Sequence, residues 1–257
     1  MCTPRWSPGV ARRPSVLLAA LAVLAVMHVD SWAHDEEDLK TAISLANLLR
    51  AARTVISANQ DLINDATIGD KGLSGQVVLG NAIENYRKLT GGDPRDVDPE
   101  SRQGRLLAAQ MVAVVEVMDE NQATINSPNV GFKGFVPAVF ARLVNERFKR
   151  KIGDEAEVKV TGPPERVRNR KARPDQWESE MIQNKLMSPK WPKGDVLSMV
   201  AQNDGREAFR LLVPEYYGAG CLACHGEPRG EIDITGYPKE GGKLGELGST
   251  ISVSLFR

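Results

Sequence analysis

The stretch EAFRLLVPEYYGAGCLACHG, residues 207–226, joins a mostly apolar run to a tight cluster of cysteine and histidine. The segment from Ala208 to Tyr217 is rich in aromatic and aliphatic residues, which predicts a β-strand. Directly after it, Cys221-Leu222-Ala223-Cys224-His225 holds two of the three cysteines and one of the three histidines in the chain. The fold therefore has to present a chemically reactive turn at the end of a strand.

The spacing C-x-x-C-H is the attachment signature of c-type haem. Two thiols three positions apart can each form a thioether with a vinyl group of one porphyrin, and the histidine that follows can ligate the iron. We predict one covalently attached haem c, with Cys221 and Cys224 as attachment points and His225 as the proximal iron ligand.

Three other uses of the cysteine pair compete with haem attachment. Structural zinc needs four Cys or His ligands, and beyond the motif residues 34–257 offer only His34. A thioredoxin-like pair opens a helix within a βαβ pattern, which Gly218, Gly220, Gly226 and Pro228 around this motif disfavour. A simple disulfide would form in an oxidising compartment if no haem were attached.

The N-terminus has the order of a secretory signal peptide. Arg5, Arg12 and Arg13 precede the apolar run Val16–Met27, and a short polar stretch follows in which Ser31 and Ala33 are the small residues that cleavage requires. A run of twelve apolar residues is well short of the roughly 20 that a membrane span needs, so an uncleaved anchor is the less favoured alternative. We expect residues 1–33 to be removed after Ala33 and residues 34–257 to act in the periplasm without a membrane span.

Composition is typical of a globular protein: 257 residues, 42% hydrophobic and 26% charged, with a formal net charge of 0. Residues 1–33 contain three arginines and one aspartate, so their removal leaves a formal charge of −2. A chain without a net positive charge has no strong field to attract nucleic acid, and none is expected as a partner.

Hydrophobic periodicity changes along the chain from helical to strand-like. A helical half followed by a small antiparallel sheet predicts the α+β class. The expected helices cover residues 36–65, 77–89, 105–125, 137–152 and a short segment within 173–186, and the expected strands cover 157–162, 208–217 and 249–256.

Several side chains outside the motif are candidates to contact the haem. Phe132, Phe135 and Phe140, with Phe148, could line a planar ligand. Arg50 and Arg53 could donate hydrogen bonds to a distal ligand or to propionates, or could form a solvated helix face. The basic segment Arg166–Asp175 has two possible roles. It could bind haem propionates through Arg168 or Arg170, or it could form a solvated loop.

The second axial position of the iron is left open. Met118 and Met111 are thioether candidates, but both lie on an apolar helix stripe where methionine commonly fills the core. An open or water-bound iron is at least as compatible with the sequence. The other candidates are His34, Met181, Met187 and Met199.

Taken together, several segments resemble a bacterial family of exported c-haem domains of largely unknown function with a PAS-like fold. The resemblance covers about residues 39–257 and implies a helical N-terminal arm packed on a five-stranded antiparallel PAS-like sheet. It also implies that residues 34–257 form a single domain and that Cys221, Cys224 and His225 hold the haem. Where relatives read closer to RNPxNxP, this chain has Arg170, Lys171 and Arg173. The segments are GFVPAVFARLVNERF, EVKVT, VRNRKARPDQWE, EAFRLLVPEYYGAGCLACHG and GSTISVSLFR.

This reading predicts a periplasmic single-haem protein that senses redox state or a small gas ligand and passes the signal to a separate signalling protein. The alternative is a soluble electron-transfer cytochrome c that serves a periplasmic redox enzyme as its partner. An open iron favours the sensor, and a firmly held sixth ligand favours electron transfer. Enzymatic activity of the haem peroxidase type is not expected, because His34 is the only spare histidine for acid–base work.

Overall fold

The computed structural model describes the backbone of residues 17–257 and the side chains of residues 34–257. The chain divides into two units, Met1–Glu37 and Asp38–Arg257. The basic start of the predicted signal peptide, with Arg5, Arg12 and Arg13, lies outside the described residues. From residue 17 onward, no helix is both long enough and apolar enough to cross a membrane.

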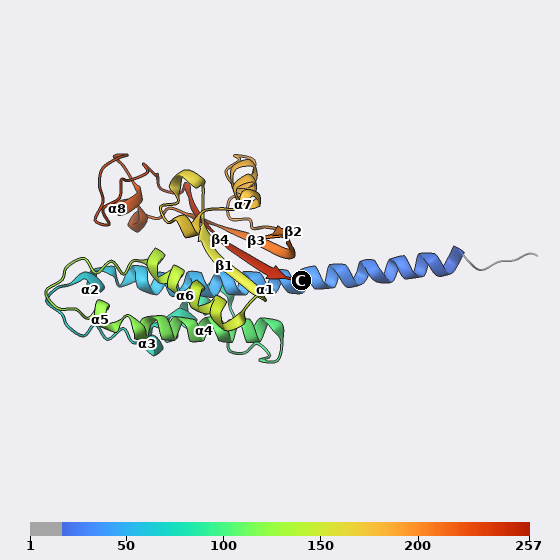
Figure 1. The fold of residues 1–257 in the computed structure, drawn as a ribbon, viewed down its shortest axis with the longest axis horizontal. Coiled ribbons are helices and arrows are strands. Elements are labelled where there is room, and N and C mark those ends of the chain that lie inside the picture. Colours follow the sequence, from blue (N-terminus) through green and yellow to red (C-terminus); the bar gives the residue numbers. More distant parts are fainter. Residues whose placement is uncertain (1–16) are drawn as a thin grey trace, which may run out of the picture. The chain divides into compact units, whose positions relative to one another are not determined.

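Helices form one layer of the unit that begins at Asp38 (Figure 1). Ser74 and Ser101 cap two of them by accepting hydrogen bonds from the backbone N–H groups of Val77 and Gly104. A Cβ at Gly75 would come 2.5 Å from the Val115 carbonyl oxygen, so a glycine is needed where α3 meets α4. The helices are α1 (Leu17–Ala58), α2 (Gln60–Asn64), α3 (Gly75–Thr90), α4 (Arg102–Glu120), α5 (Gln122–Ile125) and α6 (Pro137–Ile152).

The sheet is antiparallel throughout, and its first strand pairs with its last. Val158 on β1 lies opposite Val253 on β4, and Val253 lies opposite Leu211 on β3. The order is β1-β4-β3-β2, with β1 (Ala156–Thr161), β2 (Leu197–Asn203), β3 (Arg206–Tyr216) and β4 (Leu247–Phe256).

Alternation along the strands separates an apolar inner face from a polar outer face. Ile251, Val253 and Leu255 on β4 point into the main core that the helices also line, which confirms the alternation expected for this strand. The intervening Ser252 and Ser254 belong to the outer face. The helical layer therefore covers one face of the sheet and leaves the other face to shorter elements.

The outer face is partly covered by α7 (Gln176–Met181), which continues as a π-helical turn, Ile182–Leu186 (Figure 1). Asp175 and Glu178 form a capping box, since each side chain accepts a hydrogen bond from the other residue's backbone N–H. This confirms the short helix predicted after Pro174. The 3₁₀ turns are η1 (Pro164–Arg166), η2 (Arg170–Ala172) and η4 (Ala219–Cys221).

The α+β class is confirmed, but the expectation of five strands is wrong: the described residues form a four-stranded sheet. Between His225 and Leu247 the chain makes only an isolated bridge, Ile232 to Pro238. Pro228, Pro238 and six glycines in this segment remove backbone donors or favour turns, which prevents a regular ladder. A long loop therefore connects the cysteine cluster to β4.

Candidate functional site

The cysteine cluster forms one helical turn at the end of β3. Helix α8 (Leu222–His225) follows η4 directly, and the glycines on either side limit it to that turn. Residues three apart on a helical turn lie on the same side, so the turn brings Cys221 and Cys224 together. Both thiols are free, with Cys221 exposed and Cys224 half-buried. Burial, followed by the negative charge of Asp233, raises the pKa of the Cys224 thiol.

The imidazole of His225 is held on one side by a carboxylate. Its Nδ1 lies 2.8 Å from Oε2 of Glu240. An ionised carboxylate only accepts hydrogen bonds, so Nδ1 carries the proton and donates it. In the neutral ring the other nitrogen, Nε2, is then the one with a free lone pair, and within residues 34–257 it makes no hydrogen bond. This tautomer leaves Nε2 as the ring's electron-pair donor.

Tyr217 fixes the plane of the imidazole. The two rings are stacked, with centroids 5.5 Å apart and planes 20° apart. A Cβ at Gly242 or Gly248 would lie 2.4 Å or 2.5 Å from carbons of the Tyr217 ring. The Arg166 guanidinium lies 5.7 Å from the centre of the same ring. The tyrosine thus occupies a slot that exists only because both neighbours are glycines.

Arg168 connects the turn to the loop that follows it. Its guanidinium donates to the Cys224 carbonyl at 2.8 Å, to Asp233 Oδ2 at 2.6 Å and to Glu240 Oε1 at 2.5 Å. Burial raises the pKa of Glu240, but hydrogen bonds from Arg168 and His225 outweigh it and the net pKa is lowered. The pKa of Asp233 is likewise well below its usual range, because hydrogen bonds from Thr235 and Arg168 outweigh the effect of burial. For Arg168, the prediction that its side chain belongs to a solvated loop is therefore wrong.

The loop after the turn exposes unusually large apolar side chains. Leu244, Ile234 and Ile232 are 69, 65 and 62% exposed, the three highest values among the large apolar residues of the described chain. Tyr237, in the same loop, is 51% exposed and lies under the Arg168 guanidinium. Such a concentration of exposed apolar surface beside reactive side chains is characteristic of a contact or ligand site.

The other predicted site residues have structural partners. Arg53 donates to Glu215 Oε2 at 2.5 Å, and Arg50 lies 3.4 Å from Glu215 Oε1 and also donates to the Pro214 carbonyl. Burial raises the pKa of Glu215, but the charge and hydrogen bond of Arg53 outweigh it and lower the pKa overall. These arginines therefore fasten α1 to the end of β3, two residues before Tyr217, and are not a solvated helix face.

Two of the phenylalanines predicted to contact haem and two of the methionines predicted as iron ligands lie in or against the main core. Phe135 and Phe140 are buried there in an edge-to-face pair with centroids 6.1 Å apart, and Phe132 is half-buried. Met118 is fully buried in the core, and Met111 packs against it. The structure thus brings together Cys221, Cys224 and His225, and it gives Phe135, Phe140, Met118 and Met111 packing roles.

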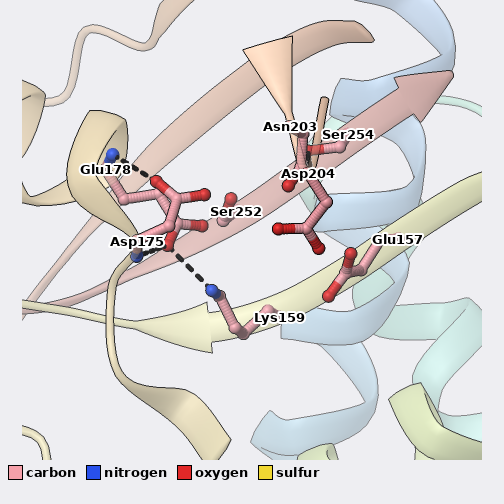
Figure 2. A pocket seen from close by; sticks show the side chains of 8 residues that line it. All are labelled: Glu157, Lys159, Asp175, Glu178, Asn203, Asp204, Ser252 and Ser254. Atoms are coloured by element: carbon pink, nitrogen blue, oxygen red, sulfur yellow. Dashed lines mark hydrogen bonds and ion pairs between the residues drawn. The ribbon is translucent and has the colours of Figure 1, made fainter. Parts of the chain in front are cut away.

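A second polar site lies on the outer face of the sheet (Figure 2). Arg210, only 1% exposed, donates to Asp175 Oδ2 at 2.5 Å and lies 3.6 Å from Glu178. Lys159 is 2.8 Å from the other oxygen of Glu178. Lys159, Asp175 and Glu178 border an open pocket of about 90 Å³, which is also lined by Glu157, Asn203, Asp204, Ser252 and Ser254. Within the described residues, no three His, Cys, Asp or Glu side chains are placed to hold a metal ion.

Comparison with known proteins places the chain in a family. Residues 97–255 match the family described as Tll0287-like, a match that spans more than half of the chain and includes α4, α6, the sheet except for its last residue, Phe256, and the cysteine turn. No curated protein and no solved structure matches it. On the strength of the family match, this chain belongs to the Tll0287-like family.

Proposed function

We propose that this protein is a periplasmic, single-haem c-type sensor of redox state or of a small gas ligand. The observation that carries the proposal is the turn Cys221–His225, which combines two free thiols with an imidazole oriented by Glu240. When bound, haem supplies one-electron redox chemistry and an axial position for a ligand. Membership of a family related to haem binding supports the same reading.

The residues present fit a covalently attached porphyrin. The exposed thiol of Cys221 and the half-buried thiol of Cys224 are spaced by one turn, as thioether attachment requires. Nε2 of His225 has its lone pair available for iron, while Nδ1 donates to a carboxylate, the arrangement usual for metal-binding histidines. The exposed apolar side chains of Ile232, Ile234 and Leu244 would gain from contact with a large apolar ring.

The sensor is favoured over the electron carrier because two of the methionines proposed as a sixth ligand, Met118 and Met111, are engaged in the core. Met118 is buried among the helices, and moving it to iron would open a cavity in the main core. Met111 packs against the same core. With these two methionines held in the core, and unless His34, Met181, Met187 or Met199 reaches the iron, the iron would keep a position where a small molecule can bind.

The remaining parts of the proposal concern location, fold and partner. The order of charge and apolarity in residues 1–33 supports export, with His34 as the first residue after cleavage. An antiparallel sheet with helices on one face and its first strand beside its last is compatible with a PAS-like domain. We expect the signal to pass to a separate signalling protein, and we expect no enzymatic turnover.

The test is the absorption spectrum of the matured protein, oxidised and reduced, with and without carbon monoxide. The sensor proposal predicts a spectrum that is high-spin or that shifts when the gas is added. A low-spin reduced spectrum that carbon monoxide leaves unchanged would overturn the sensor role in favour of electron transfer. Met118→Leu and Met111→Leu would then be compared, since only a ligating methionine would change the spectrum when replaced.

A further inference from the structure

The carboxylate that meets His225 is held in place by more than its contact with the imidazole. Glu240 is mostly buried, and both of its oxygens are used. Oε1 accepts from Arg168 Nε at 2.5 Å, and Oε2 accepts from Arg168 Nη2 at 3.1 Å and from His225 Nδ1 at 2.8 Å. A two-pronged guanidinium contact fixes both the position and the plane of a carboxylate. The acceptor for Nδ1 is thus set before any ligand binds.

Arg168 is itself held by groups from two other segments. Asp233, whose side chain is 0% exposed, lies 2.6 Å from Nη1, and Thr235 Oγ1 lies 3.2 Å from the same nitrogen. Nη2 also reaches the Cys224 carbonyl at 2.8 Å. The guanidinium therefore joins the cysteine turn to the loop at residues 233–240. Because it contacts both ends, its position relative to His225 is determined by the turn as well as by the loop.

We infer that Glu240, clamped by Arg168, is a positioning residue that fixes the tautomer of His225 and makes Nε2 a stronger electron-pair donor. This inference rests on the proposed function, because it concerns the same histidine as an iron ligand. A carboxylate that accepts a hydrogen bond from Nδ1–H increases the basicity of the imidazole and stabilises the more positive state of a bound metal. Arg168 offsets much of the negative charge of Glu240, so the directional hydrogen bond accounts for the main effect.

The chain offers a matched control for this inference. Glu231 lies in the same loop, is half exposed and pairs with Lys239 at 3.3 Å, but it does not contact His225. Glu231→Gln and Glu240→Gln remove the same formal charge from the same loop. Only Glu240→Gln changes the acceptor at Nδ1. Arg168→Lys adds a third comparison, because it keeps a positive charge but loses the two-pronged contact with Glu240.

The first measurement is the midpoint potential of the matured protein. We expect Glu240→Gln to raise it relative to wild type and to Glu231→Gln, and Arg168→Lys to raise it less. A tenfold change in the relative stability of the oxidised and reduced forms corresponds to about 59 mV for one electron. Equal potentials for Glu240→Gln and Glu231→Gln would overturn the inference, because they would leave only a general charge effect.

The second measurement needs no haem and so separates this inference from the proposed function. In the full chain carrying Cys221→Ala and Cys224→Ala, nitrogen NMR of His225 reports which ring nitrogen is protonated. We expect the Nδ1–H form, and a mixture of tautomers when Glu240→Ala is added. A predominant Nε2–H form with Glu240 present would overturn the inference. Failure of the wild-type chain to acquire haem would contradict the proposed function, and the NMR result would still decide the role of Glu240.

Discussion

Replacing Arg210 by methionine should destabilise the protein strongly, although the residue lies away from the cysteine turn. The guanidinium is almost fully buried and is bonded to Asp175 Oδ2 at 2.5 Å and to the Gln202 carbonyl at 3.1 Å. It also lies 4.2 Å from the centre of the Trp177 ring. Methionine would fill similar space but would leave Asp175 without this partner and Glu178 buried with one cation fewer.

The size of the stability loss in Arg210→Met depends on which ion pairs remain. Removing one partner of a buried ion pair typically costs about 3–5 kcal/mol of unfolding free energy. Glu178 keeps Lys159 at 2.8 Å, and the Asp175 side chain is about one-third exposed, so the loss should lie at the lower end, about 3 kcal/mol. For a chain of this length that corresponds to a fall in melting temperature of about 6–12 °C.

Urea unfolding of the two variants Arg210→Met and Arg206→Met provides the assay. Arg206 is on the same strand but is exposed, where it donates to the Asp154 carbonyl and lies 4.0 Å from the centre of the Phe256 ring. We expect Arg206→Met to cost at most about 1 kcal/mol. If the two variants lose the same stability with unchanged denaturant slopes, the assignment of a stabilising buried ion network on the outer face is refuted.

Two further predictions concern the contacts around the cysteine turn. Gly242→Ala should cost about 1–3 kcal/mol of stability, because the added Cβ would overlap the Tyr217 ring. The control Gly218→Ala should be near neutral, because the space around Gly218 is open. Thermal unfolding compares the two variants, and equal losses would contradict the claim that Tyr217 needs a glycine at residue 242. Glu215 has a lowered pKa, so its contribution to stability is present above the unfolded pKa of about 4.3 and is lost as pH falls toward the folded value. Glu215→Gln should therefore have a lower free energy of unfolding than wild type at pH 7, and that free energy should fall less when the solution is acidified. Urea titrations at several pH values measure both proteins. Parallel plots of unfolding free energy against pH would contradict the role assigned to the Arg53 contact.

Local patterns in the sequence predicted most elements but missed one strand. The apolar stripe of α4, the bounds of α6 and the alternation of β4 are confirmed, because each depends on residues within one element. Strand β2 was missed because its pattern is weak, with Leu197 and Asn203 its only buried residues. The signal that could have found it is Asp204-Gly205, where both residues have positive φ, a two-residue hairpin turn that requires a strand before β3.

The candidate site was predictable only where its residues are adjacent in the chain. Cys221, Cys224 and His225 are identified by their spacing. Their partners come from elsewhere in the sequence: Glu240 lies 15 residues after His225, and Arg168 lies 56 residues before Cys224, whose carbonyl oxygen accepts its hydrogen bond. Glu240 meets His225 because a long irregular loop folds back on the turn. Neither periodicity nor composition marks such a contact. The basic neighbours of Arg168 suggested a solvated loop, whereas its guanidinium pairs with the buried Asp233, which is distant in sequence.

The central claim is covalent attachment of one haem through the cysteine turn, and the intact mass of the denatured protein tests it most directly. The chain would be produced with export in a host that assembles c-type cytochromes, beside the variant with Cys221→Ala and Cys224→Ala. We predict that the wild-type chain keeps the added mass of one haem after denaturation and that the variant does not. A wild-type chain without added mass, from cells in which another c-type cytochrome is fully matured, would contradict the claim.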